Sequence, residues 1–224
     1  MNNNITVELK PIVFCNIGWC RNYLGEENDP LFNGGSYVKI NNTGNEHINY
    51  LPFTDVNPET GMEELIFLGS YETKHTRGIN NQTHIENIHC CRGLSKDDYV
   101  DDVIVVWCAT DPNGSSCVVG WYNHARIYRN YEVVEIMQDD GYTYERWFNI
   151  MSLAKDAVLL PVDVRRKIQW KIPRHSTANK VPFGFGSSNI WYASEPEAEL
   201  FVKQMIYRID HYSGLNINPS LELF

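Results

Sequence analysis

An apolar, β-branched run followed by a tight-turn sequence is the feature that most constrains how this chain folds. Residues Val103–Ala109 have the sequence VIVVWCA, and Asp111–Ser115 follows as DPNGS. Proline fixes φ and glycine permits positive φ, so DPNGS favours a turn. Val118–Arg129 is a second long strand-like run. We therefore expect a hairpin whose first strand is central in a sheet and covered on both faces.

Shorter strand-like runs surround this hairpin, and one amphipathic helix closes the chain. The runs are Ile12–Ile17, His47–Phe53, Glu64–Leu68 and Ile85–Cys90. Ser194 and Glu197 have the spacing of a capping box, and Gly214 occupies the position typical of a C′ glycine. Between them, apolar residues at helical spacing predict one buried face: Ala198, Phe201, Val202, Met205, Ile209 and Tyr212. The predicted class is α+β, mainly β, a small barrel with peripheral helices and a C-terminal amphipathic helix.

Length and composition narrow the class of protein further. The 224 residues are enough for one domain, which we place at 1–214, with 54–99 as an insertion or variable region and 215–224 as a tail or linker. The sequence has no long apolar run and no apolar signal core at its start, so we expect a cytoplasmic protein without a membrane partner. The six cysteines are too sparse for a disulfide scaffold, and we expect reduced, mostly buried thiols.

Charge is distributed unevenly along the chain. The formal net charge is −9, which argues against a surface that coats nucleic acid everywhere. Residues 151–182 nevertheless carry a formal charge of +5, while the rest of the chain carries −14. Such a segment can contact phosphates, although a solvated strand and loop without a ligand would have the same composition. Arg126 and Arg129 on the preceding strand would extend the basic surface if they faced the same way.

Three segments combine aromatic side chains with small or polar ones. They are Gly18-Trp19 with Asn33–Tyr37 downstream, Gly120–His124, and Phe183–Ala193. Glycine lets a backbone approach a flat ligand, serine and asparagine can pair with a base edge, and indole or phenol faces can stack on a base. Packing in the core is the alternative for each of these tryptophans.

Three sequence blocks carry a resemblance to known proteins: DDVIVVWCATDPNGSSCVVGWYNHARIYR, AKDAVLLPVDVRRKIQWKIPR and FGFGSSNIWYA. They resemble a bacterial family found as an N-terminal region ahead of HNH-type nucleases. They are also similar to PUA-like modified-base readers, the superfamily of the EVE, YTH, ASCH and SRA domains. The resemblance covers residues 11–213 and is weak over Thr54–Tyr99.

The resemblance implies a curved β-barrel that holds a flipped or single-stranded modified base in an aromatic cage. It implies cage positions at Trp19, Trp121 and Tyr122, and polar readout by Ser36 and Asn123. To this site we add Trp191 as a third wall, together with Tyr37 and Asn189. For phosphate binding we expect six basic residues: Arg126, Arg129, Arg165, Arg166, Lys171 and Arg174.

The expected function is therefore recognition of modified double-stranded DNA, as the sensor of a bacterial restriction or antiviral defence system. The chain lacks an HNH motif, so we expect no catalytic residue here and a nuclease in a partner subunit or further domain. No Walker or GxGxxG motif is present, and we expect no cofactor.

Two other classes of function stay open. One is a β-barrel module that binds a protein or small ligand without nucleic acid. The other is a hydrolase that pairs His124 with Cys117 or Cys108, although apolar surroundings disfavour a reactive thiolate. A zinc site made by His84, His89, Cys90 and Cys91 is disfavoured, because an alternating strand would split these ligands between two faces. The acidic run Asp97, Asp98, Asp101 and Asp102 is expected to be a solvated turn.

Overall fold

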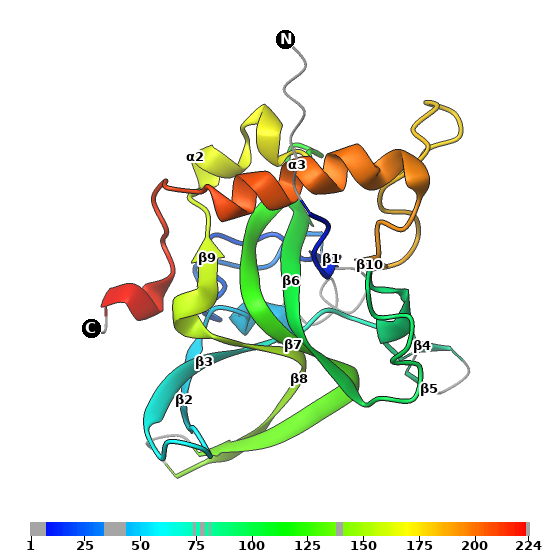
Figure 1. The fold of residues 1–224 in the computed structure, drawn as a ribbon. Helices are drawn as coiled ribbons and strands as arrows, with labels where there is room; N and C mark the ends of the chain where they lie inside the picture. Colours follow the sequence, from blue (N-terminus) through cyan, green and yellow to red (C-terminus); the bar gives the residue numbers. More distant parts are fainter. Residues whose placement is uncertain are drawn as a thin grey trace.

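The computed structural model describes residues 8–33, 44–73, 75–76, 79–80, 82–137 and 141–222. These form a mainly β structure around one large mixed sheet (Figure 1). The strand order is β10-β1-β6-β7-β8-β3-β2, with β9 paired to β7. The strands of this sheet are β1 (Ile12–Ile17), β2 (Pro52–Val56), β3 (Glu63–Gly69), β6 (Tyr99–Thr110), β7 (Ser116–Met137), β8 (Thr143–Leu153), β9 (Ala157–Leu159) and β10 (Ile190–Trp191).

Short helices and a small second sheet complete the described structure. Strands β4 (His75–Thr76) and β5 (Ile79–Asn80) pair only with each other. The α-helices are α2 (Val162–Arg165) and α3 (Glu199–Asp210), and α3 crosses one face of the sheet over β6 and β7 (Figure 1). The 3-10 helices are η1 (Asn45–Ile48), η2 (Ile85–Asn87), η3 (Ala154–Asp156), η4 (Ile168–Trp170), η5 (Pro196–Ala198) and η6 (Pro219–Glu222). No helix in the described part of the chain is long and apolar enough to cross a membrane.

The predicted hairpin is confirmed as β6 and β7. Thr110 pairs with Ser116 at its closed end, and the Asp111 carboxylate accepts hydrogen bonds from the backbone N–H groups of Asn113 and Ser115. Gly114 has φ 83°, which is the positive value the turn requires. Strand β7 is bent, so that its first part pairs with β6 and its second part with β8 (Figure 1).

Strand β6 is central and covered on both faces, as its composition predicts. Val103, Val105 and Trp107 pack in one buried cluster. Ile104, Val106 and Cys108 alternate with them and pack in a second cluster beneath α3. Side chains on a strand alternate between faces, so one continuous apolar run serves two cores.

The sheet is open, and this differs from the expected barrel. Its ends are β10 and β2, which the described pairing leaves apart. Strand β10 has only two residues, and β2 is half exposed, so neither presents a long edge that could close a barrel. Strand β1 lies beside β6 in parallel, with Phe14 opposite Val106, so their carboxyl ends meet at one end of the sheet.

Helix α3 buries the predicted face but does not begin with the predicted capping box. Every residue of that face packs in the second cluster, and Ile206 joins them. The helix begins after the 3-10 turn η5, and its N-cap, Ala198, makes no side-chain hydrogen bond. It ends at Asp210, so Gly214 lies beyond the C-cap.

Two of the shorter strand predictions are confirmed and two are wrong. Ile12–Ile17 is β1, and Glu64–Leu68 lies within β3. His47–Phe53 instead begins in η1 and enters β2 only at Pro52. Ile85–Cys90 is η2 followed by a turn rather than a strand, because successive backbone N–H groups there bond to carbonyls three residues back.

Candidate functional site

The predicted cage aromatics are buried and divided between the two faces of the sheet. Trp19 and Tyr122 belong to the cluster that contains Trp107. Trp121 and Trp191 belong to the cluster covered by α3. None of the four is more than 6% exposed. Adjacent residues of a strand point to opposite faces, so Trp121 and Tyr122 cannot line the same cavity.

Close contacts hold these rings in place. Trp121 stacks on Trp170 with centroids 5.4 Å apart, and Trp191 lies 4.8 Å from Phe14. The Tyr122 hydroxyl donates to the carbonyl of Asn49. The structure therefore does not bring the four aromatic side chains together, because each ring packs against neighbours in one of two separate cores.

The predicted polar readers are also separated. Asn123 lies on β7, where its carbonyl accepts a hydrogen bond from the Ser152 hydroxyl at 3.0 Å. Asn189 is half-buried beside the end of β1, where its side-chain nitrogen donates to the carbonyl of Glu72 at 3.1 Å and its side-chain oxygen lies 3.5 Å from the Asn16 amide nitrogen. Ser36 and Tyr37 lie outside the described residues.

Two of the predicted phosphate ligands are buried structural residues. Arg165 is fully buried and donates to the carbonyls of Leu160, Cys20 and Arg21 at 2.6–2.7 Å. Arg129 is 9% exposed and donates to the carbonyls of Asp97 and Leu94 and to the Glu86 carboxylate. These guanidinium groups hold neighbouring segments of the chain in place through hydrogen bonds to backbone carbonyls, and they are not accessible to a phosphate backbone.

Arg126 is committed to a different contact. Its guanidinium makes two hydrogen bonds with the Asp101 carboxylate, at 2.6 and 2.9 Å, and lies 4.1 Å from the centre of the Tyr99 ring. A bidentate pair of this kind neutralises the arginine. It contributes little to a basic surface.

The remaining predicted basic residues gather at the closed end of the β6–β7 hairpin. Arg166 lies 3.7 Å from Asp111, and the backbone of Lys171 forms an isolated β-bridge with that of Cys117. Arg174 donates to the hydroxyls of Ser116 and Thr110 and to the side-chain oxygen of Asn16, at 2.6, 2.8 and 3.1 Å. We name the exposed cations at this end the hairpin-end basic patch: Arg166, Lys167, Lys171 and Arg174.

Amide side chains border the patch where β1 and β6 end. Asn16 contacts both Arg174 and Asn189. Asn33 donates from its side chain to the carbonyl of Thr110 at 3.1 Å and has φ 59°. Positive charge therefore lies next to several groups that can donate and accept hydrogen bonds.

The cysteine–histidine pair of the hydrolase hypothesis does not form. Burial raises the pKa of Cys117 to about 11 and that of Cys108 well above its ordinary value. His124 lies seven residues from Cys117 along β7, which corresponds to about 20 Å of strand. It is exposed instead, with Nδ1 2.6 Å from the carboxylate of Asp102.

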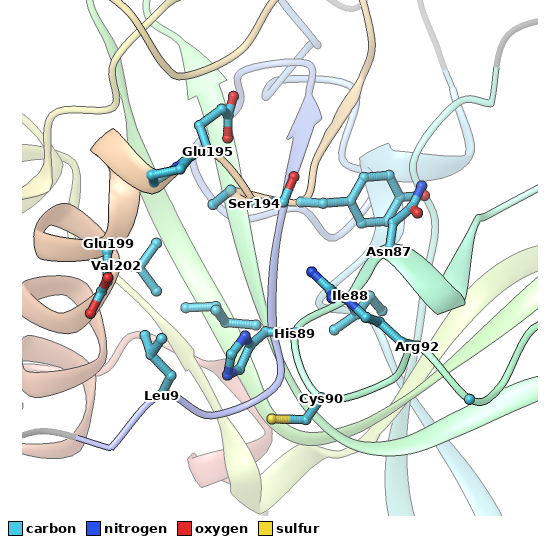
Figure 2. A pocket seen from close by; sticks show the side chains of 15 residues that line it. Leu9, Asn87, Ile88, His89, Cys90, Arg92, Ser194, Glu195, Glu199 and Val202 are labelled. Carbon is cyan, nitrogen blue, oxygen red and sulfur yellow. The ribbon is translucent and has the colours of Figure 1, made fainter.

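A pocket that sequence reasoning did not predict lies at the other end of β1. Its cavity has a volume of about 560 Å³, and the close view in Figure 2 shows its walls. One wall is the segment that follows η2, and the other is the segment that leads into α3. The residues that line the cavity include Leu9, Ile12, Ile88, His89, Cys90, Arg92, Glu195, Glu199 and Val202.

Two lining residues of this pocket have unusual backbone conformations. Cys90 has φ 68° and Ala193 has φ 49°, in the left-handed region that side chains with a Cβ atom rarely adopt. The sequence signal at this site was the His89-Cys90-Cys91 run. Among the described residues, no group of three or more His, Cys, Asp or Glu side chains is placed to hold a metal ion.

Comparisons with known proteins give no relative for this chain. No protein-family model matches it, and no significant match is found among curated proteins or solved structures.

Proposed function

We propose that this chain binds nucleic acid through the hairpin-end basic patch. The observation that carries the proposal is the clustering of four exposed cations at one end of a protein with a net charge of −9. A local concentration of positive charge attracts the phosphate backbone, while the acidic remainder keeps binding elsewhere weak.

The same end of the molecule supplies groups suited to a base. Asn16 and Asn189 are both half-buried; Asn16 accepts a hydrogen bond from Arg174, and its amide lies next to that of Asn189. Amide groups can pair with the edge of an extruded base, and a flipped base costs a few kcal/mol of stacking. We place base recognition here rather than among the buried tryptophans.

The sequence resemblance supports the more specific part of the proposal. It suggests a PUA-like reader of modified DNA that serves as the sensor of a bacterial restriction system, with cleavage carried out by a partner or further domain. A mixed, curved sheet with a central bent hairpin is compatible with that class. Mixed sheets of this kind occur in many unrelated proteins, so the assignment to PUA-like readers rests on the sequence resemblance and not on the sheet.

The salt dependence of binding tests the patch. The double variant Lys167→Gln, Lys171→Gln is expected to lower the slope of log Kd against log salt by about 1.8, since each phosphate contact contributes about 0.9 for duplex DNA. Both lysines are exposed, so folding is expected to be unchanged. Fluorescence anisotropy with a labelled duplex at several salt concentrations measures the slope.

Lys96→Gln is the matched control for this experiment. Lys96 is exposed and precedes β6, at the opposite end of that strand from the patch. Its substitution should leave the slope unchanged. An equal loss in the control, or an unaltered slope in the double variant, would exclude the patch as the phosphate-binding surface.

Plain, methylated and hydroxymethylated duplexes of one sequence test the base-reading part. We expect tighter binding to a modified duplex, and Asn189→Ala should reduce that preference more than it reduces binding to the plain duplex. Equal affinity for all three duplexes would exclude recognition of modified bases, while nucleic-acid binding itself would stand.

A further inference from the structure

We propose that the pocket between η2 and α3 binds a small organic monocarboxylate with an apolar body. This site lies at the opposite end of β1 from the hairpin-end basic patch, and it goes beyond nucleic-acid binding. Its volume of about 560 Å³ falls within the range of small-ligand pockets.

Arg92 supplies the group that would hold the carboxylate. Figure 2 shows its side chain reaching toward the middle of the pocket, between Ser194 and His89. Arg92 is exposed and makes no hydrogen bond or ion pair with any residue in the described part of the chain. A guanidinium is always charged near neutral pH, and its planar fork matches a carboxylate.

The two acidic residues of the pocket, Glu195 and Glu199, disfavour a ligand with more than one negative charge. Both Glu195 oxygens accept from the Trp191 indole N–H, at 3.0 and 3.1 Å. Glu199 pairs with Lys203 at 2.6 Å. Neither carboxylate pairs with Arg92, which is the one fixed cation among the described lining residues. A dianionic phosphate would face more repulsion than a carboxylate with one delocalised charge.

Apolar side chains line the remainder of the cavity. Ile12 and Val202 are buried at the floor, where β1 faces α3, and Leu9 and Ile88 extend the same surface. Burial of a ring or short chain against them would contribute about 25 cal/mol per Å² of apolar surface. The combination of one guanidinium and this surface defines the ligand class.

Cys90 provides a direct reporter of occupancy. It is the one exposed cysteine, whereas the other five are buried. Iodoacetamide should therefore alkylate Cys90 in the folded protein, which peptide mass spectrometry can follow. We expect 3-phenylpropionate to slow this alkylation. Two control compounds should slow it at least tenfold less effectively: 3-phenylpropionamide, which is uncharged, and phenyl phosphate, which carries two negative charges.

Arg92→Gln tests the role of the guanidinium. Loss of a charge-assisted hydrogen bond is expected to weaken 3-phenylpropionate binding by about tenfold or more, measured by calorimetric titration. Arg21→Gln removes the same charge from an exposed side chain that does not line the pocket, and it should leave the affinity unchanged. Circular dichroism and the thermal midpoint check that both variants fold.

Several outcomes would overturn the proposal. Equal protection by the acid and its amide would remove the carboxylate requirement, and stronger protection by phenyl phosphate would contradict a monoanion. Unchanged affinity in Arg92→Gln would exclude the assigned cation. Absence of protection by 3-phenylpropionate at about 10 mM would exclude the site as a binder of this class. None of these results depends on nucleic-acid binding, which is measured with different variants.

Discussion

Two consecutive arginines show how far local environment separates residues of the same type. Arg165 is completely buried and donates to backbone carbonyls, while Arg166 is exposed beside Asp111. The loops that meet at Arg165 come from residues 20–21 and 160, far apart in the sequence. Arg165 is therefore a structural crosslink, and Arg166 is available to a ligand.

Arg165→Met is expected to lower the free energy of unfolding by about 3 kcal/mol or more. The substitution leaves carbonyls that now accept charge-assisted hydrogen bonds unpaired inside the protein. Arg166→Met is the matched control and should cost no more than about 1 kcal/mol, because the Arg166 side chain is exposed and its contact with Asp111 is long, at 3.7 Å. Urea unfolding measures both, and similar costs for the two variants would contradict the structural role of Arg165.

Glu86 makes stability depend on acid pH. Hydrogen bonds from its own backbone N–H, from Arg129 and from His84 lower its pKa from 4.5 to about 2. A carboxyl whose pKa is lower in the folded state stabilises that state above its unfolded pKa, and this stabilisation is lost as pH falls through the folded value. Stability should therefore decline between about pH 4.5 and 2.

Glu86→Gln should flatten this decline, because a neutral amide does not titrate. It should also be less stable than the wild type near neutral pH, since it leaves the Arg129 guanidinium without its carboxylate. Urea midpoints at neutral and acid pH measure both effects, and Glu59→Gln on an exposed turn is the control. An unchanged acid profile in Glu86→Gln would show that other groups cause the decline.

At the scale of elements, paired irregularities bend the β6–β7 hairpin. The register shifts between Val100 and Val103 on β6, and between Val103 and Val105 where β7 has an extra residue. Each shift includes an exposed residue of positive φ, Asp102 at 62° and His124 at 50°. Bulges increase strand twist, so they help β7 leave β6 and pair with β8.

Substitutions of His124 test this conformation. His124→Gly should leave stability unchanged or raise it by up to about 1 kcal/mol, because glycine adopts positive φ without strain. His124→Val should lower it by about 1–2 kcal/mol, since a β-branched residue is strained there. Glu135→Val, at an exposed position in the regularly paired part of β7, should have little effect. Equal effects of the two His124 variants in urea unfolding would argue against the left-handed conformation.

The helix boundary illustrates a limit at the same scale. Apolar spacing predicted the buried face of α3, because that face depends only on helical periodicity and burial. The capping box was wrong, since η5 inserts a tighter turn between Ser194 and the helix. The first residue of a helix depends on the local backbone conformation, and the same residue spacing is compatible with more than one such conformation.

At the scale of the whole molecule, one sheet separates two hydrophobic cores. Strands β6 and β7 contribute to both, and α3 closes only one. The aromatic residues of the chain were used mainly for this purpose, which explains why Trp19, Trp121 and Trp191 do not form a cage. Large rings bury much apolar surface, so core packing is their most common use.

The roles of the basic residues also depend on the complete fold. The basic segment 151–182 was visible in the sequence, but burial divides its arginines between structural and exposed roles. The pocket beside Arg92 had only a weak signal, the His89-Cys90-Cys91 run. Its walls come from residues 9–12, 87–93 and 192–202, and no local pattern indicates that such distant segments meet.

Sequence alone determined the hairpin, its turn, the central position of β6 and the buried face of α3. These features follow from residue periodicity and turn chemistry within short stretches of chain. Three other features became visible only in the folded chain: the open sheet, the burial of the aromatic residues, and the set of cations that reach the surface. Those outcomes depend on contacts between segments far apart in the chain, because burial of a side chain is set by whatever packs against it.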